Sequence, residues 1–166
     1  MVVPGWLLRG LRTALVRCVM AFLMAMSLLV GAQAQDSPLV KQELRPAVLL
    51  EVTKLQQLPG KQIVELRFDV TNQSASVANL ADLGLVNEGW VNNVVLLDWK
   101  SAQVYSVGWF NSGQVRYFCS YVTGAGPIQP GQRMDFWAWF GAPPAGVTNL
   151  ALRVPGVPPV DIPLTR

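Results

Sequence analysis

Acidic side chains are the first candidates for chemistry in this chain, because it contains no histidine. Without histidine there is no Ser-His-Asp or Cys-His nucleophile, no imidazole base, and none of the usual zinc or copper ligand sets. Glycoside hydrolysis needs only two carboxyl groups, about 5–10 Å apart. The spacing of the acidic residues indicates no such pair, and most of them alternate with apolar residues as on a solvated strand face. The carboxylates considered are Glu65, Asp69, Asp82, Glu88, Asp98 and Asp135. We therefore expect no enzymatic activity and no catalytic residue.

Two polar stretches carry weaker signals, one for metal binding and one for glycosylation. Residues 79–93 offer amide and carboxylate oxygens, which are the ligands that calcium prefers. They are Asn79, Asp82, Asn87, Glu88, Asn92 and Asn93. The stretch lacks EF-hand spacing, so side chains that close local turns are the simpler interpretation, and we expect no metal and no cofactor. The triplet Asn72-Gln73-Ser74 fits an N-glycosylation acceptor, although this motif is short and common.

Cys119 is the one cysteine that follows the N-terminal apolar run, which holds Cys18. A single cysteine cannot form an intramolecular disulfide. It is either buried as a small hydrophobic residue or paired with a second chain. We expect burial, because unpaired cysteine is among the most buried residue types.

Two tryptophans, Trp137 and Trp139, are one residue apart in the stretch "MDFWAWFGAPP". Side chains in a strand alternate between its two faces, so the tryptophans share one face with Asp135. The opposite face is apolar throughout and carries Met134, Phe136, Ala138 and Phe140. This apolar face is predicted to pack into the core. The two indoles would then lie on the outer face, about 6–7 Å apart along the strand.

An outward pair of indoles would form an apolar patch, which monomeric proteins seldom leave without use. The patch could stack on a sugar ring, anchor a protein partner, or be covered by the polar leader or the proline-rich tail. In "QVRYFCSYV", Tyr117 and Tyr121 share a face with Cys119. If this strand lies beside the tryptophan strand with its tyrosines outward, the four rings form an aromatic platform. Trp137, Trp139, Tyr117 and Tyr121 are therefore the candidate binding residues.

Short β-strands must position these side chains. The alternation is clearest in "IVELRFDV" (63–70), where apolar residues at even positions alternate with charged residues. About seven or eight such stretches, with turn signals roughly every 8–12 residues and no convincing helix after the N-terminus, predict an all-β, immunoglobulin-like antiparallel sandwich. A small antiparallel barrel is the alternative. The expected strands cover residues 48–55, 63–70, 94–99, 103–109, 114–122, 133–140 and 147–154.

The N-terminus has the pattern of a secretory signal peptide. Three arginines precede an apolar run of 13 residues (18–30), and "AQA" at 32–34 provides a small-x-small cleavage site. The run is shorter than the roughly 20 residues of a membrane span, and an uncleaved anchor is the alternative. We expect a signal peptide with a helix over residues 1–34, a flexible leader over 35–45 and the sandwich domain over 46–166.

The charge balance narrows the choice of partners. The whole chain has a formal net charge of +3. Removal of residues 1–34 takes away three of the thirteen basic residues and no acidic residue, which leaves ten of each sign. A neutral domain gives no compositional support for binding nucleic acid or anionic lipid. We expect a protein of the periplasm, the cell envelope or the extracellular space, with no stable membrane span after cleavage.

The last third of the chain contains an ordered series of short motifs. An aspartate strand is followed by a tyrosine strand, a Cys-Ser pair, a "PG" turn, an aromatic strand ending in "F-x-APP", and a strand leading to a "P-x-x-P" tail. These motifs fall on Asp98, Tyr105, Cys119, Ser120, Pro130, Gly131, 140–144 and 155–163. The series resembles a group of bacterial secreted Ig-like domains of unknown function, which are sometimes found beside OmpA-like envelope modules. The resemblance implies an Ig-like sandwich at the cell envelope without a catalytic residue. The chain departs from it near "GWVNN" and at Trp139, where a polar residue is typical.

These features predict an exported, non-enzymatic Ig-like module that binds another envelope protein or subunit through an aromatic surface. A carbohydrate-binding module for cell-wall or surface glycans is the main alternative. A carboxylate enzyme is a further one, and so is a pilus or fibre subunit that assembles by strand addition.

Overall fold

The computed structural model describes residues 37–111 and 115–166. The predicted signal peptide and its helix lie outside these residues. The described part of the chain forms twelve strands and no helix. Consequently it contains no helix long and apolar enough to cross a membrane.

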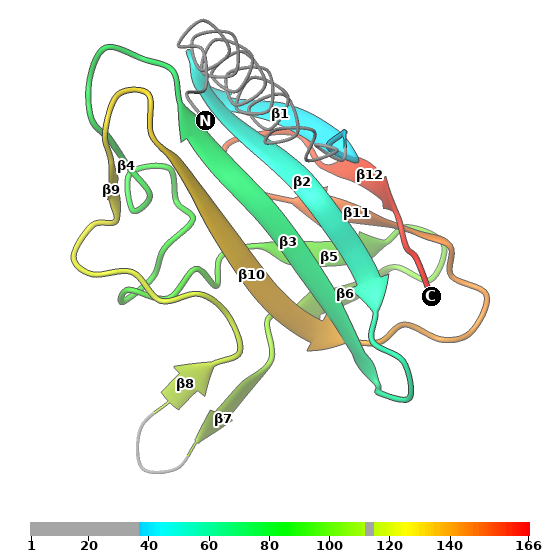
Figure 1. Cartoon of the computed structure of the whole chain (residues 1–166). Coiled ribbons are helices and arrows are strands. Elements are labelled where there is room, and N and C mark those ends of the chain that lie inside the picture. Colours follow the sequence, from blue (N-terminus) through cyan, green and yellow to red (C-terminus); the bar gives the residue numbers. More distant parts are fainter. Residues whose placement is uncertain (1–36, 112–114) are drawn as a thin grey trace, which may run out of the picture. The chain divides into compact units, whose positions relative to one another are not determined.

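Two four-stranded antiparallel sheets form the body of the fold (Figure 1). The first sheet has the order β1-β2-β3-β10 and consists of β1 (Val40–Arg45), β2 (Val48–Gln57), β3 (Ile63–Asn72) and β10 (Arg133–Gly141). The second sheet has the order β12-β11-β5-β6 and consists of β5 (Val95–Asp98), β6 (Gln103–Ser106), β11 (Asn149–Arg153) and β12 (Val160–Pro163). This arrangement confirms the predicted all-β antiparallel sandwich.

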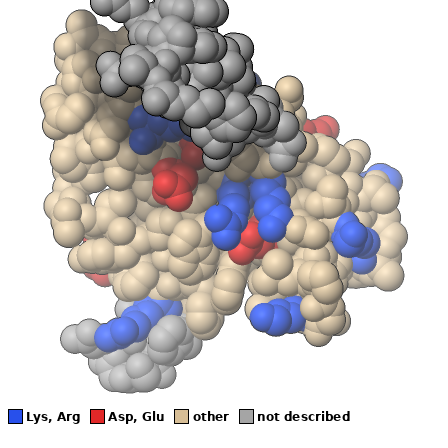
Figure 2. Space-filling view, in the orientation of Figure 1, with Lys and Arg blue, Asp and Glu red and all other residues tan. Residues whose placement is uncertain are grey.

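The outer face of the first sheet carries the charged residues of β3. Glu65, Arg67 and Asp69 alternate with inward apolar residues, as the sequence pattern predicts. Figure 2 shows basic and acidic side chains side by side on this face. Glu65 pairs with Arg67, and Asp69 pairs with Arg133. The two acidic residues are only 7% and 8% exposed, so this face is charged but partly shielded from solvent.

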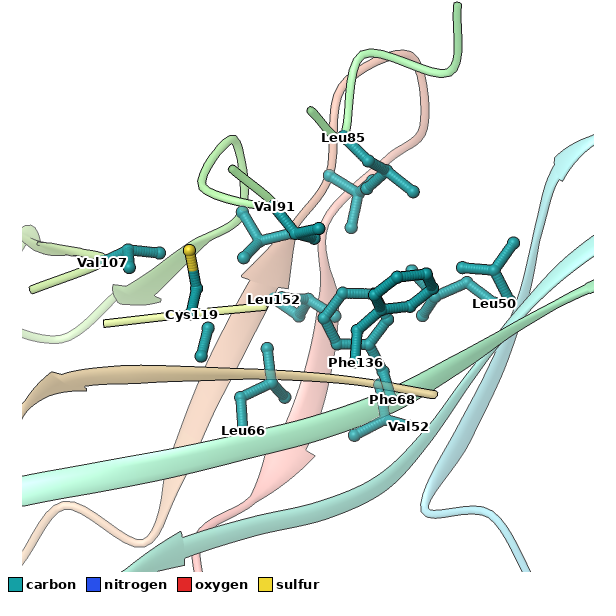
Figure 3. Packing of buried hydrophobic residues seen from close by; sticks show 14 of the residues in the cluster. Leu50, Val52, Leu66, Phe68, Leu85, Val91, Val107, Cys119, Phe136 and Leu152 are labelled. Atoms are coloured by element: carbon teal, nitrogen blue, oxygen red, sulfur yellow. The ribbon is translucent and has the colours of Figure 1, made fainter. Parts of the chain in front are cut away.

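The core lies between the two sheets. Met134 at the start of β10 is half-buried, and the other inward apolar residues of β3 and β10 are buried: Val64, Leu66, Phe68, Val70, Phe136, Ala138 and Phe140. Figure 3 shows Phe68 and Phe136 meeting between the first sheet and Leu152 of β11, with ring centroids 5.5 Å apart. The prediction that the phenylalanine face of the "MDFWAWFGAPP" strand packs inward is therefore confirmed.

Two short strand pairs lie outside the main sheets: β4 (Ala78–Asn79) with β9 (Pro127–Ile128), and β7 (Trp109–Asn111) with β8 (Val115–Tyr117). The β7–β8 pair divides the predicted strands over 103–109 and 114–122. After β6, Val107 bridges to Phe140 of β10, and the chain then turns outward at Gly108. A Cβ at Gly108 would lie 3.3 Å from the Phe118 ring, so glycine fits this close approach best.

The segment predicted as a flexible leader forms a strand in its second half. Residues 40–45 are β1, which pairs antiparallel with β2. Its side chains alternate between half-buried and exposed, and the exposed ones are Lys41, Glu43 and Arg45. An edge strand commonly carries such charges because they prevent pairing with other chains. Because most of its residues are charged or polar, the sequence of this strand shows no clear alternation. The prediction of a flexible leader is therefore wrong for residues 40–45.

The proline-broken tail also forms a strand, β12, which pairs with β11. Proline is tolerated on an edge strand because its missing N–H can face away from the ladder. Beyond β12, Thr165 reaches β2 of the first sheet. Gln57 N donates to Thr165 O at 2.8 Å, and Thr165 N donates to Leu55 O at 3.0 Å. With the Val107–Phe140 bridge, this contact links the two sheets at both sides of the sandwich.

Asn72, the possible glycosylation acceptor, is fully buried at the end of β3. Its amide nitrogen donates to Ser76 O at 2.8 Å and to Ile128 O at 2.9 Å, and its oxygen accepts from Ser74. Both amide hydrogens are therefore engaged inside the protein. The glycosylation interpretation is wrong for the folded chain, and the residue instead ties β3 to β9.

Candidate binding site on an outer aromatic face

Trp137 and Trp139 lie on the outer face of the first sheet, as predicted from strand parity. They pair across the sheet with Arg67 and Glu65 of β3. Their ring centroids are 5.4 Å apart, with the planes inclined by 54°. Both side chains are half-buried. The pair is therefore an apolar cluster with one side open, and the two rings are not coplanar.

A segment after β8 continues the first sheet beyond β10. Trp139 N donates to Phe118 O, and Ser120 N donates to Trp137 O, each at 2.9 Å. Cys119 lies opposite Ala138 and points into the core, where it is 3% exposed. The expected burial of Cys119 is confirmed, and burial raises the pKa of its thiol to about 11, with a weaker opposing effect from a backbone hydrogen bond.

The inward position of Cys119 places its neighbour Phe118 on the outer face. The Phe118 ring stacks on Trp139 with centroids 6.0 Å apart and planes inclined by 22°. Phe118 thus occupies the position that the sequence analysis assigned to the tyrosines. In this segment Phe118 faces outward and Cys119 faces inward. A platform of four rings with Tyr117 and Tyr121 would need the opposite orientation.

Tyr117 and Tyr121 contact Trp90 instead of Trp137 and Trp139. The Trp90 ring centroid lies 6.1 Å from Tyr117 and 4.9 Å from Tyr121. A Cβ on Gly89 would meet the Tyr121 ring at 2.6 Å, and Gly89 has a φ of +83°, so glycine is required beside this cluster. By strand parity the tyrosines lie on the same side as Cys119, but both are at the margin of the core, where Tyr117 is half-buried and Tyr121 is 59% exposed.

Trp109 is a member of the site that the sequence analysis missed. It begins β7, is 61% exposed, and lines a hollow of about 230 Å³ together with Ile63, Phe118 and Trp139. A strand pattern could not reveal this position, because the chain leaves the sheet at Gly108 and the alternation is interrupted. We call Trp109, Phe118, Trp137 and Trp139 the aromatic face.

Glu65 holds Trp139 in position within the aromatic face. It accepts hydrogen bonds from Trp139 Nε1 at 3.1 Å, Arg67 Nε at 2.9 Å and Lys54 Nζ at 3.1 Å. Burial alone raises the pKa of Glu65, but the hydrogen bonds from Arg67, Trp139 and Lys54 outweigh it and lower the pKa to about 2. The carboxylate is therefore ionised, and the indole of Trp139 is anchored by a charge-assisted hydrogen bond.

Three further carboxylates, Glu51, Asp69 and Asp98, also have defined partners. Arg133 lies between two carboxylates: its Nη1 is 3.8 Å from Glu51 Oε2, and its Nη2 is 2.5 Å from Asp69 Oδ2. Asp98 accepts hydrogen bonds from Ser101 Oγ and Lys100 N, and the bond from Ser101 is the main reason that its pKa is lowered. These carboxylates support local structure.

The polar loop over residues 79–93 bonds mainly within itself. Asn79 donates to Asp82, and Asn93 donates to Gly84 O. Across the described residues, no three His, Cys, Asp or Glu side chains come together as metal ligands.

Comparison of the chain with protein-family models gives no match, and comparison with curated proteins gives none either. The candidate site is therefore defined by its geometry.

Proposed function

We propose that this protein is an exported, non-enzymatic module of Ig-like type that binds another cell-envelope protein through the aromatic face. The observation that carries the proposal is the continuity of four large rings over β10 and its neighbouring segments. Trp109 is 61% exposed and Phe118 is 37% exposed, and they continue the half-buried tryptophan pair into an apolar hollow. Aromatic residues in a partly desolvated patch are typical centres of protein interfaces.

The ring geometry favours a protein partner over a glycan at this face. A sugar needs a flat aromatic surface and several polar groups around it to pair with its hydroxyls. The tryptophan rings are inclined by 54°, and Gln62 is the one polar side chain among the residues that line the hollow. An apolar side chain of a partner protein needs no such polar groups.

Charge around the aromatic face indicates the chemistry of the partner. The side chains of Arg67 and Lys54 are 54% and 38% exposed, and they share one carboxylate, Glu65. Asp135 lies on the same outer face, two residues from Trp137, and carries the opposite charge, so the surroundings of the rings are mixed in charge. We infer that the partner presents an apolar side chain with charged groups of both signs around it, which would also guide association.

Export rests on the sequence pattern of residues 1–34, and the envelope location rests on the resemblance to secreted Ig-like domains. Both are part of the proposal.

The proposal is tested with a photo-crosslinking amino acid at position 109 in cells that produce the full chain. The crosslinked protein is identified by mass spectrometry, purified, and titrated against the wild type and variants. We expect Trp109→Ala to weaken binding at least tenfold, which corresponds to about 1.4 kcal/mol at an interface hot spot. The side chain is mostly exposed, so its removal should leave the fold intact.

A matched control is available on the opposite sheet. Trp99 is 63% exposed, close to the value for Trp109, and lies beyond the end of β5. Trp99→Ala should bind the partner as the wild type does. The proposal is wrong if no protein crosslinks, if Trp109→Ala keeps full affinity, or if both variants lose affinity equally.

A further inference from the structure

A second hollow lies on the outer face of the second sheet, beside the turn that joins β5 to β6. Its volume is about 250 Å³. Its floor is formed by Leu97 and Ala151, which pair across the sheet and are 8% and 1% exposed. Their neighbours Leu96, Leu150 and Leu152 belong to the central core, so by strand alternation the floor residues point away from it. The floor is therefore an apolar surface separate from the core.

Trp99 stands at the edge of this floor. It is 63% exposed, the largest exposed fraction of any large apolar side chain in the described part of the chain. The turn that carries it is fixed by Asp98, which accepts hydrogen bonds from Lys100 N at 3.0 Å and from Ser101 Oγ at 2.7 Å. An exposed indole on a fixed turn loses little conformational freedom when a flat ligand stacks on it.

Polar groups of several kinds surround the hollow. Lys100 supplies a donor, Asp161 an acceptor, and Asn149 both. No hydrogen bond or ion pair within the described residues engages the side chains of Asn149 and Asp161, and both residues are exposed. A second wall is the loop over residues 146–148, which Arg166 fixes by donating to Pro144 O and Val147 O at 3.0 Å each.

We propose that this hollow, defined by Leu97, Trp99, Lys100, Asn149, Ala151 and Asp161, binds one ring of a neutral saccharide. A pyranose ring has an apolar C–H face that packs against an indole, and an edge of hydroxyl groups that both donate and accept hydrogen bonds. In the Trp99 hollow, the indole matches the C–H face, and the polar side chains at the rim match the hydroxyl groups. A strongly anionic ligand is disfavoured, because Asp161 balances the charge of Lys100 at the rim.

The size of the hollow sets the number of rings. Its volume of about 250 Å³ is smaller than the roughly 300–1,000 Å³ of sites for drug-sized ligands, so one ring fits inside. Further rings of an oligosaccharide would extend over the surface. This site is independent of the protein-binding role proposed for the aromatic face, because the two lie on different sheets.

The experiment uses the full chain, purified as the cell produces it, on an array of immobilised neutral and acidic oligosaccharides. The strongest binder is then titrated while tryptophan fluorescence is followed. We expect binding of at least one neutral oligosaccharide, and we expect Trp99→Ala to weaken it at least tenfold. Trp109→Ala, the matched exposed tryptophan of the aromatic face, should bind with unchanged affinity.

Rim variants separate a sugar site from nonspecific stacking on an exposed indole. Asn149→Ala and Asp161→Ala should each weaken binding several-fold, and Trp99→Phe should retain part of it. Asn149 and Asp161 are exposed, and their side chains form no hydrogen bond with any residue that the structure describes, so loss of fold is not expected, and circular dichroism checks this. The proposal is overturned if no oligosaccharide binds, if only acidic ones bind, if Trp99→Ala binds normally, if the rim variants have no effect, or if Trp109→Ala is equally impaired.

Discussion

Glu65 and Trp139 hold each other in place on the outer face of the first sheet. The indole N–H donates to one carboxylate oxygen, and Lys54 and Arg67 donate to the other. The residues pair across β3 and β10, so their side chains meet without any distortion of the strands. A charged residue is thereby retained at 7% exposure, because each oxygen has a donor. The sequence pattern placed Glu65 on a wet face and gave no sign of this network.

Replacement Glu65→Gln should lower stability at neutral pH by about 2 kcal/mol, because Lys54 and Arg67 lose their charged partner. The folded pKa of Glu65 is about 2, below its ordinary value of 4.5. Its ionised form therefore stabilises the fold above pH 4.5, and this contribution is lost as pH falls from 4.5 through 2. Urea unfolding between pH 7 and pH 2 should show the wild type losing more stability than Glu65→Gln over that interval.

Asp135→Asn is the control for this measurement. Asp135 is an exposed carboxylate on the same strand as Trp139, so its replacement should change neutral-pH stability by less than about 0.5 kcal/mol. A Glu65→Gln variant with the same loss between pH 4.5 and pH 2 as the wild type would contradict the network.

Some strands can be predicted from the alternation of apolar and polar residues in the sequence, and others cannot. The strands β3 and β10 are predicted correctly, because the inward face of each is dominated by apolar residues. The edge strands β1 and β12 were missed, because an edge strand buries less surface and tolerates charges and prolines. At this scale Asn72 is a specific connector, since it links the end of β3 to residues 74–76 and to β9.

Replacement Asn72→Ala should destabilise the protein by about 2–3 kcal/mol. It would leave Ser76 O and Ile128 O without the donor that reaches them at 2.8 and 2.9 Å, and Ile128 is itself fully buried. Thermal unfolding followed by circular dichroism measures the effect. Asn93→Ala is the control, because Asn93 is exposed and has one side-chain bond, to Gly84 O. Equal effects from the two replacements would show that Asn72 is not a connector.

The whole molecule depends on contacts that join the two sheets at their sides. Thr165 closes one side by pairing with β2, and the Val107–Phe140 bridge closes the other. Such closure covers backbone groups that would otherwise be open to pairing with other chains. The hollow of the aromatic face borders the second of these contacts, because Phe140 lines it, whereas the Trp99 hollow shares no residue with either contact.

Replacement Thr165→Pro should lower stability by about 1–2 kcal/mol, because it removes the N–H that donates to Leu55 O. Thr165→Ala keeps this backbone bond and loses only the hydroxyl bond to the same oxygen, at 3.0 Å. It should therefore cost less than Thr165→Pro. Chemical denaturation of the two variants provides the comparison, and equal stabilities would mean that the backbone pairing does not secure this side.

The sequence by itself determined the fold class, the inward face of β10 and the outward position of Trp137 and Trp139. These properties follow from the alternation of side chains, which can be recognised within a single strand without knowing its neighbours.

Tertiary structure decided which segment lies next to β10 and which of its side chains face outward. Cys119 faces inward opposite Ala138, so Phe118 joins the tryptophans while Tyr117 and Tyr121 pack on Trp90. Neighbours across a sheet are set by pairing between distant segments, and shifting that pairing by one residue exchanges the two faces. The Trp99 hollow depends on tertiary structure for the same reason, because β5, β11 and β12 meet only in the folded chain.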